Sequence, residues 1–373
     1  MRQMQDSLED YLYDCTSIFM DYDQWTLAKE WLDRLKGAFP DHPSLPIMEA
    51  EIEMGLDDYE DAYTLLKEIL EAEPYDSEAW DLMAETCVAL DEFNEALEAA
   101  DYALAINPKD STALLMKANA YMHEGPAAEA IEHYRQYLEL QPDDLSVQIS
   151  LALCYSSEER WGEALPVLEK AETLALKQPE READLSQVLQ LKAFALSRLD
   201  RIPEAITLVQ KAREYCEESM SWKCHLTEGD IRLQARQTNQ AEESFTKALE
   251  KSPEKGDTLF NIALSYSNAG YNDVAIDLLD DVWTMFGTQE GKFVVPYLAN
   301  CYLRKNDMKN YLKYLNLASY CDREATKFLF HDRYPNIAPE EYYAYAFKEV
   351  YGFFPKDNTA SQDNGEILYP ETD

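Results

Sequence analysis

The sequence has little glycine, little positive charge and no long apolar run. Only 11 of its 373 residues are glycine, which argues against phosphate-cradling loops and against a glycine-punctuated β-sandwich. Lys and Arg number 33 against 72 Asp and Glu, so the formal charge is −39. Such a charge works against nucleic-acid binding, which depends on cationic side chains. No run of about 18 apolar residues occurs, so we predict no membrane-spanning segment.

Cysteine is also scarce, and its distribution argues against a disulfide framework. The seven cysteines are odd in number, widely spaced and never arranged as CxxC. This pattern favours reduced thiols in a reducing compartment. The first twenty residues carry four acidic residues and lack the basic start and apolar stretch of a secretory signal. We therefore expect a cytoplasmic protein.

The dominant positive feature is a period of 34 residues. An apolar content of 46% is enough for a substantial core, and the apolar residues are arranged in recurring units. Prolines recur with the period at positions 40, 74, 108 and 142, each twelve residues after an alanine. The alanines are Ala28, Ala62, Ala96 and Ala130, continued by Ala164 and, after a longer connection, by Ala205, Ala241 and Ala275. A fixed period of this length indicates stacked supersecondary units.

Each unit reads as two helices joined by a short turn. In the third unit Ser77 is the predicted N-cap of the first helix, and apolar residues recur every three or four positions over 80–87. Asp91 and Glu92 mark the predicted turn. A second apolar stripe over 93–104 predicts the second helix, which ends before Pro108 because a proline disfavours helix at the preceding residue.

Small residues also recur inside the predicted first helices, where they would face the alanines of the second helices. Between two such small residues the helix axes can approach closely, and a bulky replacement would cost about 1–3 kcal/mol. Gly229 and Thr16 take this place in the seventh and first units. The alanines are Ala50, Ala84, Ala118, Ala152, Ala193 and Ala263.

These units resemble the tetratricopeptide repeat (TPR). The family's pattern places Trp, Leu, Gly or Ala, and Tyr on the first helix, then Ala, Phe and Ala on the second, closed by Pro. Gly287 stands where the eighth unit should close with proline. The matches include Trp80, Ala84, Ala96, Ala103 and Pro108 in the third unit and Gly229, Ala241, Phe245, Ala248 and Pro253 in the seventh. The resemblance, which extends to stand-alone bacterial TPR proteins, implies an all-α fold: a right-handed α-α superhelix (TPR solenoid) of about eight to nine helix-turn-helix repeats with a C-terminal capping helix.

The expected organisation has three parts. Residues 1–321 form the solenoid, with units ending near 40, 74, 108, 142, 178, 217, 253, 287 and 321. The charged connection 172–186 is interpreted as an elongated loop inside one solenoid, with a domain boundary as the alternative. Aromatic residues crowd 322–355, where capping helices are expected, one near 338–350; a dimerisation or docking surface is the alternative. Residues 356–373 are expected to be an acidic disordered tail.

No catalytic or metal-binding constellation emerges from the sequence. The five histidines never form the helical pair of a zinc protease. Cys216, Cys224 and His225 make the only cluster of metal-ligating types, and structural zinc usually needs three or four convergent ligands. No nucleophile, base and orienting group can be assembled. We therefore predict no enzyme, no cofactor and no metal site.

Negative charge is concentrated in the second and third units. Residues 51–100 contain 17 acidic residues and one basic residue, Lys67, whereas residues 201–250 contain 9 acidic and 7 basic residues. The acidic block is interpreted either as a solvated face that keeps a long solenoid soluble or as a landing zone for a basic partner.

The resemblance also implies which residues would line a concave groove. In the family, first helices line the groove, and the groove-facing places are about the second, fifth, ninth and twelfth of each unit. Carried over, they make the groove acidic in the third unit and apolar or small-polar further on. The candidate groove residues are Glu78, Asp81, Glu85, Thr112, Leu115, Asn119, Met122, Ile149, Leu153, Phe260 and Leu264. Relatives that grip a C-terminal carboxylate use Lys, Arg and Asn at such places; only Asn119 fits, and Glu51, Asp81 and Glu85 would repel a carboxylate.

The hypothesis from the sequence is a non-catalytic scaffold that binds a basic and apolar peptide or protein segment in its concave groove. No nucleic acid and no membrane are expected as partners. The alternatives are a regulatory or assembly subunit of an enzyme complex, or a homodimerising structural factor that uses the C-terminal aromatic region.

Overall fold

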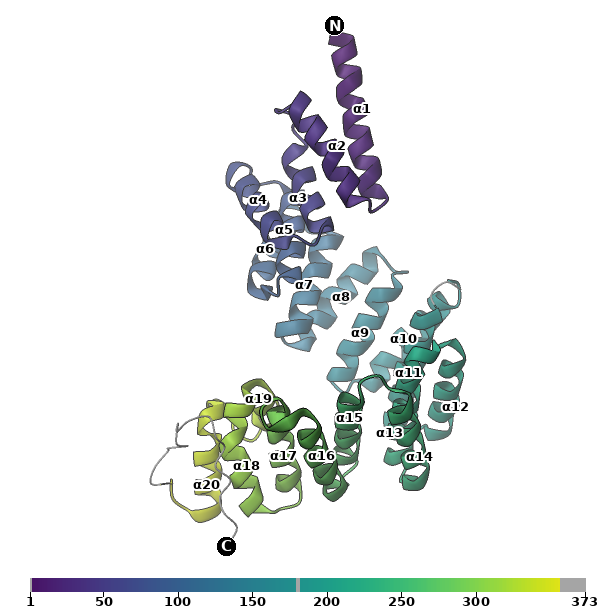
Figure 1. Cartoon of the computed structure of the whole chain (residues 1–373), viewed down its shortest axis with the longest axis vertical. Helices are drawn as coiled ribbons and strands as arrows, with labels where there is room; N and C mark the ends of the chain where they lie inside the picture. The colour runs from purple at the N-terminus through teal and green to yellow at the C-terminus, as the bar shows by residue number, and fades with distance from the viewer. Residues whose placement is uncertain (1, 179–181, 356–373) are drawn as a thin grey trace. The chain divides into compact units, whose positions relative to one another are not determined.

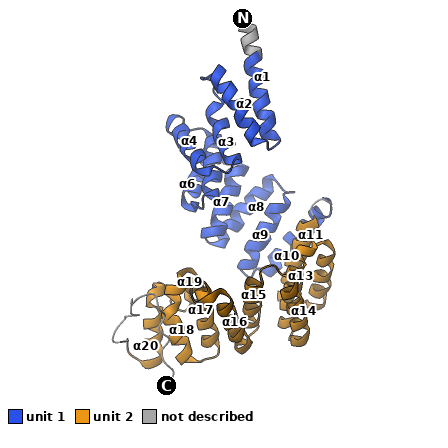
Figure 2. Ribbon diagram, in the orientation of Figure 1, with its two compact units in different colours: residues 1–181 blue, residues 182–373 orange. Residues whose placement is uncertain are grey.

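A computed structural model describes residues 2–178 and 182–355, and every regular element in those ranges is a helix (Figure 1). The helices α1–α18 form nine successive hairpins, each a pair joined by a short turn. This arrangement confirms the expected all-α fold of helix-turn-helix repeats. The chain divides into two compact units, residues 1–181 and 182–373 (Figure 2), within the connection 172–186.

Unit 1 contains five of these hairpins. Their helices are α1 (Arg2–Asp21), α2 (Trp25–Ala38), α3 (Leu45–Gly55), α4 (Tyr59–Ala72), α5 (Ser77–Ala89), α6 (Phe93–Ile106), α7 (Ser111–Glu124), α8 (Ala127–Leu140), α9 (Leu145–Ser157) and α10 (Trp161–Ala175).

Unit 2 contains the other four hairpins and the C-terminal helices. These are α11 (Glu182–Arg198), α12 (Ile202–Ala212), α13 (Ser221–Gln234), α14 (Thr238–Lys251), α15 (Lys255–Asn268), α16 (Asn272–Glu290), α17 (Val295–Arg304), α18 (Met308–Cys321), α19 (Arg323–Phe330) and α20 (Tyr342–Tyr351).

Aspartates with the repeat period begin three of the first helices. The carboxylate of Asp76 accepts from the backbone N–H groups of Glu78 (3.0 Å) and Ala79 (3.2 Å), and Asp110 caps α7 in the same way. At the start of α9, Asp144 accepts from one backbone N–H, that of Val147 (3.1 Å). The prediction that Ser77 caps α5 is therefore wrong by one residue. A carboxylate can satisfy two otherwise unpaired N–H groups and also favours the positive end of the helix dipole.

The turn inside most hairpins contains one residue with left-handed backbone. Asp23, Asp57 and Asp91, again 34 residues apart, have φ of 54°, 62° and 60°. Beside the last of them the N–H of Glu92 donates to the carbonyl of Cys87 (2.8 Å), which closes the end of α5. Asp is among the few non-glycine residues that tolerate this conformation. Gly287, which stands where proline was expected, interrupts α16 with φ 79°.

The small residues of the repeat lie at the centre of each hairpin. Every alanine predicted for this contact is fully buried, and so is Thr16. Gly229 shows how close the helices are: a Cβ at this position would lie 2.4 Å from Cε1 of Phe245 on the partner helix α14. Close helix approach through small side chains is therefore built into the hairpins.

First helices also pack on the first helices of neighbouring hairpins. In unit 1, α3 contacts α5 and α5 contacts α7; in unit 2, α11 contacts α13 and α13 contacts α15. Among the described residues, no two successive second helices pack as closely. In each unit three successive first helices therefore lie side by side, α3, α5 and α7 in unit 1 and α11, α13 and α15 in unit 2, and the face that they form is called here the unit's inner face.

The C-terminal aromatic residues divide into a buried and an exposed group. Phe330, Tyr334 and Tyr342 pack in one core with α18, and the hydroxyls of Tyr311 and Tyr334 lie 3.1 Å apart. Phe328, by contrast, is 83% exposed. Helix α20 lies where a capping helix was expected, and none of the helices in the described ranges is long and apolar enough to cross a membrane.

Two glycine substitutions test the close approach of the hairpin helices. Gly229→Ala should destabilise the protein by about 1 kcal/mol, because overpacking against Phe245 outweighs the better helix propensity of alanine. Gly162, on α10, has no atom within 4 Å of its would-be Cβ. Gly162→Ala should therefore stabilise the protein by up to about 1 kcal/mol. Thermal unfolding followed by circular dichroism measures both, and shifts of the same sign would contradict the packing described.

Candidate functional site

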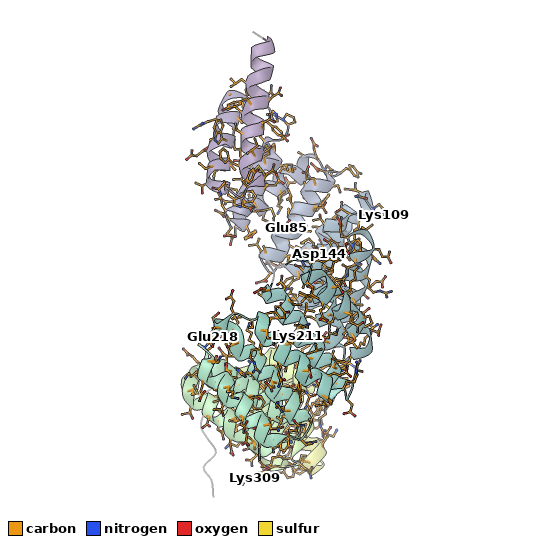
Figure 3. The ribbon with its side chains drawn as sticks, turned by 90° about the vertical axis from the view of Figure 1, so that its right-hand side faces the viewer. Glu85, Lys109, Asp144, Lys211, Glu218 and Lys309 are labelled. Carbon is orange, nitrogen blue, oxygen red and sulfur yellow. The ribbon has the colours of Figure 1, made fainter. Side chains whose placement is uncertain are left out.

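The acidic groove residues predicted for the third unit gather on the inner face of unit 1. Glu78, Asp81 and Glu85 follow one another at helical spacing along α5, and Glu85 is labelled in Figure 3. Glu51 projects from the neighbouring helix α3, and Asp110 caps α7. Because α5 packs between α3 and α7, five carboxyl groups from three helices share one region. We call it the acidic cluster.

The clustering raises the pKa values of its members. Burial first, then the charge of Asp110 and a hydrogen bond between the two carboxyl groups, and then the charges of Glu78 and Glu85, raise the pKa of Asp81 to about 7. Burial together with Glu78 and Glu85 raises the pKa of Glu51, and loss of hydration raises that of Glu85. Desolvation and like charge both disfavour the ionised form of a carboxyl group.

No protein cation compensates this charge. In the described part of the chain, Glu51, Glu78, Asp81 and Glu85 form no ion pair with a basic side chain. One carboxyl oxygen of Asp81 is buried and finds no hydrogen-bond donor there. The acidic cluster is therefore a surface of uncompensated negative charge.

The predicted groove residues of α7 carry no acidic side chain, and one of them is hydrogen-bonded within its own hairpin. Thr112 and Leu115 are half-buried, and Met122 is 39% exposed. The amide oxygen of Asn119 accepts from the hydroxyl of Tyr134 on α8 (2.7 Å), so this side chain is tied into its own hairpin.

The two candidates on α9 differ in accessibility. Leu153 is 39% exposed, whereas Ile149 is 7% exposed and contributes little to any surface. Helix α9 packs on α8 and α10, and Leu153 is an apolar side chain that it leaves partly exposed.

The two candidates on α15 lie in unit 2 and have different surroundings. Phe260 packs edge-to-face on Phe293 and Tyr297, with ring centroids 5.1 and 5.0 Å apart. Leu264 lines a pocket on the inner face of unit 2.

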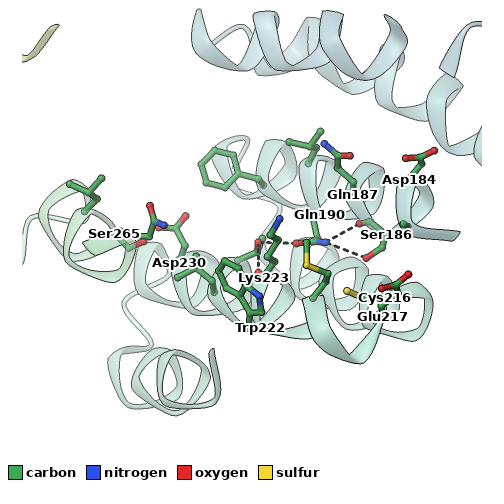
Figure 4. A pocket seen from close by; sticks show the side chains of 18 of the residues that line it. Asp184, Ser186, Gln187, Gln190, Cys216, Glu217, Trp222, Lys223, Asp230 and Ser265 are labelled. Atoms are coloured by element: carbon green, nitrogen blue, oxygen red, sulfur yellow. Dashed lines mark hydrogen bonds between the residues drawn. The ribbon is translucent and has the colours of Figure 1, made fainter. Parts of the chain in front are cut away.

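This pocket has a volume of about 800 Å³ and lies against three successive first helices, α11, α13 and α15 (Figure 4). We call it the inner pocket. Apolar side chains from all three helices line it together with amide and hydroxyl groups. The large apolar ones on these helices are Leu191, Phe194, Trp222, Leu226 and Leu264, and the amide-bearing ones are Gln187, Gln190, Asn261 and Asn268.

Hydrogen bonds order the polar part of the inner pocket. The amide of Gln190 donates to the carbonyl and hydroxyl oxygens of Ser186 (3.3 and 3.2 Å), and its oxygen accepts from Thr227 (3.4 Å). The carboxylate of Asp230 accepts from the amide of Gln234 (2.7 Å). Burial raises the pKa of Asp230, although the Ser265 and Gln234 hydrogen bonds and a nearby arginine oppose the shift.

Two ion-pair networks hold the segment 213–220, which forms one wall of the inner pocket. The buried carboxylate of Glu228 on α13 pairs with Arg213 and with Arg232, the latter at 2.7 Å. Burial raises the pKa of Glu228, but the two guanidinium groups outweigh this and leave the pKa below its usual value. Lys251 on α14 pairs with Glu218 (2.6 Å), which is labelled in Figure 3.

The groove residues predicted from the sequence do not include most of the inner pocket. The same periodic groove-facing places, the second, fifth and ninth of each unit, could have identified it. The candidate groove residues lie in the third, fourth, fifth and eighth units, whereas most residues of the inner pocket lie in the sixth and seventh. With Ala193 and Gly229 as the eighth residues of these two repeat units, the second, fifth and ninth places of each unit all line the inner pocket. They are Gln187, Gln190, Phe194, Lys223, Leu226 and Asp230.

The cysteine–histidine cluster lies beside this pocket. Cys216 lines it, whereas Cys224 is fully buried with its sulfur 3.9 Å from the Ser186 hydroxyl. Burial and the positive charges of Arg213 and Lys251 lower the pKa of His225 to about 4. The described residues contain no group of three His, Cys, Asp or Glu side chains placed to hold a metal ion.

Comparison with known proteins gives one family match and several structural likenesses. Residues 93–171 match the family of anaphase-promoting complex, cyclosome, subunit 3. No curated protein matches the chain. A tetratricopeptide repeat protein from Parabacteroides merdae is 16% identical, with 69% of this chain and 98% of that chain covered and a TM-score of 0.47.

Two further solved structures have similar sequence identities and TM-scores. YrrB, described as a TPR protein with an unusual peptide-binding site, is 18% identical over 52% of this chain and 95% of that chain, with a TM-score of 0.43. MamA from Desulfovibrio magneticus RS-1 is 20% identical over 47% and 94%, with a TM-score of 0.42. At such identities and scores these likenesses carry no information about ligands.

The raised pKa of Asp81 predicts a pH-dependent effect of Asp81→Asn. The pKa of Asp81 is about 7 in the folded protein, whereas an unperturbed Asp has a pKa of 3.8. Between these two pH values the folded protein retains a proton that the unfolded chain has released, so the folded state loses stability as the pH rises through this window. Above pH 7 the whole penalty is present. Asp81→Asn should therefore raise the free energy of unfolding by about 1 kcal/mol at pH 8, after allowance for solvent screening, and by less at pH 5.

Urea unfolding at the two pH values measures this difference. Glu71→Gln, on the exposed side of α4, removes one carboxyl group away from the acidic cluster and is the matched control. An equal effect of Asp81→Asn at pH 5 and pH 8 would show that Asp81 titrates as an ordinary carboxyl group.

Proposed function

The chain is built of tetratricopeptide-type repeats, and on that premise we propose that it is a non-catalytic scaffold for another protein. The bound segment would be basic at one end and apolar further on, and would lie on the inner face of unit 1. The observation that carries this proposal is the acidic cluster, in which carboxyl groups from three helices lie together without a basic partner.

A basic side chain of the bound segment would change two unfavourable features of the acidic cluster, the repulsion between its carboxylates and the lack of hydrogen-bond donors to Asp81. A Lys or Arg brought within about 4 Å would offset the mutual repulsion of the carboxylates, and its N–H groups would supply donors to Asp81. Charge-assisted hydrogen bonds of this kind are about twice as strong as neutral ones. Binding would also lower the pKa of Asp81, so that complex formation near neutral pH should release protons.

The apolar preference is supported by the surface that follows the acidic cluster. Leu115 and Met122 on α7, and Leu153 on α9, the first helix of the next hairpin, are partly exposed apolar side chains. Burial of such side chains would add affinity that salt does not screen. The partner segment should therefore carry Leu, Met or aromatic residues next to its basic residues.

Charge reversal in the acidic cluster tests the proposal. The probe is a fluorescein-labelled peptide with four basic residues followed by four apolar residues. The double variant Asp81→Lys with Glu85→Lys should weaken its binding by at least about tenfold at 50 mM salt and by less at 300 mM, because screening reduces the electrostatic part. Fluorescence anisotropy measures the affinity, and for the natural chain the affinity should be higher at pH 8 than at pH 6.

Because the whole chain is strongly negative, the test needs a control variant that changes the net charge by the same amount away from the acidic cluster. Glu71→Lys with Glu98→Lys changes the net charge equally, but both residues are exposed on second helices, α4 and α6. This variant should lose less than about twofold in affinity. Equal losses in the two double variants would mean that the chain attracts cations by net charge alone and would remove the basis for a site on the inner face.

The C-terminal aromatic residues support a second candidate, a factor that associates through this region. Phe328 is 83% exposed and Phe353 is 57% exposed, and exposed aromatic side chains are enriched at protein interfaces. A homodimer formed through this surface should dissociate on Phe328→Ser, which light scattering over a concentration series would detect. A chain that is monomeric at every concentration rejects the homodimer and leaves a docking surface for an assembly partner.

A further inference from the structure

Two of the seven cysteines, Cys216 and Cys224, lie together in unit 2 but differ in exposure. Cys224 is the fourth residue of α13 and is fully buried. Cys216 belongs to the segment 213–220 and is partly exposed where it lines the inner pocket. The pair therefore combines one accessible thiol with one that solvent does not reach.

The two thiol groups meet at the wall of the inner pocket. The Cys224 thiol is hydrogen-bonded to that of Cys216, and its sulfur lies 3.9 Å from the hydroxyl oxygen of Ser186. Ser186 and Cys216 both line the inner pocket, and Figure 4 shows them at the same end of it. The sulfurs of a disulfide are about 2.05 Å apart. Two sulfurs that already share a hydrogen bond therefore need to approach each other by only about 2 Å to become bonded.

The segment that carries Cys216 can supply this movement. Cys216 has an extended backbone, with φ −93° and ψ 134°, and lies between the short helices Arg213–Tyr215 and Glu218–Met220. Residues 217–220 are exposed, and two ion pairs hold the segment to α13 and α14. Cys224, in contrast, is fixed within α13. We therefore expect Cys216 to be the residue that moves when the two sulfurs approach.

The surroundings give the two thiols different chemical roles. Burial and the neighbouring Cys216 raise the pKa of Cys224 to about 11, although the hydrogen bond with Ser186 and the charge of Arg213 act in the opposite direction. Cys224 is therefore protonated near neutral pH and shielded from solvent. Since the thiolate is the reactive form of cysteine, a small reagent must react first at Cys216.

We propose that Cys216 and Cys224 form a site of reversible thiol–disulfide exchange, whose reaction partner is a small disulfide of the glutathione type. The Cys216 thiolate attacks one sulfur of the small disulfide, whose S–S bond breaks and releases one thiolate. Cys224 then loses its proton, and its sulfur attacks the Cys216 sulfur, so that a bond between the two cysteines forms and the second small thiolate leaves. The two cysteines are oxidised by two electrons, and the small disulfide is reduced to two thiols. This site depends neither on the acidic cluster nor on a bound protein segment.

Oxidised glutathione is the probe, and trypsin separates the two cysteines for detection. Cleavage after Lys223 places Cys216 in the peptide 214–223 and Cys224 in the peptide 224–232. The reduced full chain is treated with excess oxidised glutathione, the remaining thiols are blocked with N-ethylmaleimide, and the digest is analysed by mass spectrometry. Most molecules should yield the two peptides joined by a disulfide, and dithiothreitol should separate them again.

Cysteine variants test the two steps one at a time. Cys224→Ala removes the buried thiol without adding a polar group, so glutathione should remain attached to Cys216. Cys216→Ser should abolish the joined peptides and leave Cys224 unmodified, because its thiol is buried. Cys15 is the matched control within the same chain, since it is also partly exposed but the next cysteine, Cys87, belongs to another hairpin. Cys15 should carry glutathione and form no disulfide within the protein.

The pH dependence of the second step tests the role of Cys224. Loss of glutathione from Cys216 should become about tenfold faster from pH 7 to pH 8, because the thiolate fraction of Cys224 rises tenfold per pH unit below its pKa of about 11. Mass spectrometry of samples quenched at successive times measures this rate. A rate that does not depend on pH would contradict attack by the buried thiol.

The unfolded chain shows whether the fold brings the thiols together. In one fixed glutathione buffer, the ratio of bridged to reduced protein should be at least about tenfold higher for the folded chain than for the chain in urea, because the native contact removes the entropy cost of closing the loop. The proposal is overturned if this ratio is equal or higher in urea, or if the folded natural chain keeps glutathione on Cys216 and yields no joined peptides. Loss of the helical circular dichroism signal on oxidation would also overturn it.

Discussion

The close approach of the two helices in each hairpin is the constraint on which the rest of the structure depends. Alanine or glycine at the crossing brings the helices close, and at Gly229 the ring of Phe245 already occupies the space of a side chain. A hairpin this thin cannot bury all its apolar surface alone, so it must pack on its neighbours. That stacking sets the first helices side by side and thereby creates the inner faces on which both candidate sites lie.

The same constraint explains how much of the protein could be predicted from its sequence. Packing residues recur at fixed positions, so the period of Ala96 and its counterparts was enough to predict the hairpins, their order and the placement of the acidic side chains on first helices. The cap of α5 was misplaced because Ser77 and Asp76 are both good N-cap residues, and only the structure shows which oxygen accepts the helix N–H groups. The burial of Ile149 could not be predicted, because the periodic groove-facing places take no account of the neighbouring hairpin.

The inner pocket was harder to predict for a different reason. Its helix residues obey the periodic rule, but the segment 213–220, which completes its wall, lies outside the period. That segment is held by Arg213 pairing with Glu228 and by Lys251 pairing with Glu218. Such long-range ion pairs leave no local signal in a sequence in which acidic residues outnumber basic ones by more than two to one.

The carboxylates of the two inner faces differ in whether basic side chains compensate them, and therefore in their effect on the stability of the folded chain. In unit 2 the buried carboxylate of Glu228 is compensated by two arginines, an arrangement that fixes structure because loss of either partner would leave a buried charge unpaired. In unit 1 the acidic cluster has no such compensation, and the raised pKa of Asp81 shows that folding works against its ionisation. Neither the hairpin contact nor the cap of α5 uses the carboxyl group of Asp81. The basic segment proposed above would supply the positive charge that the acidic cluster lacks.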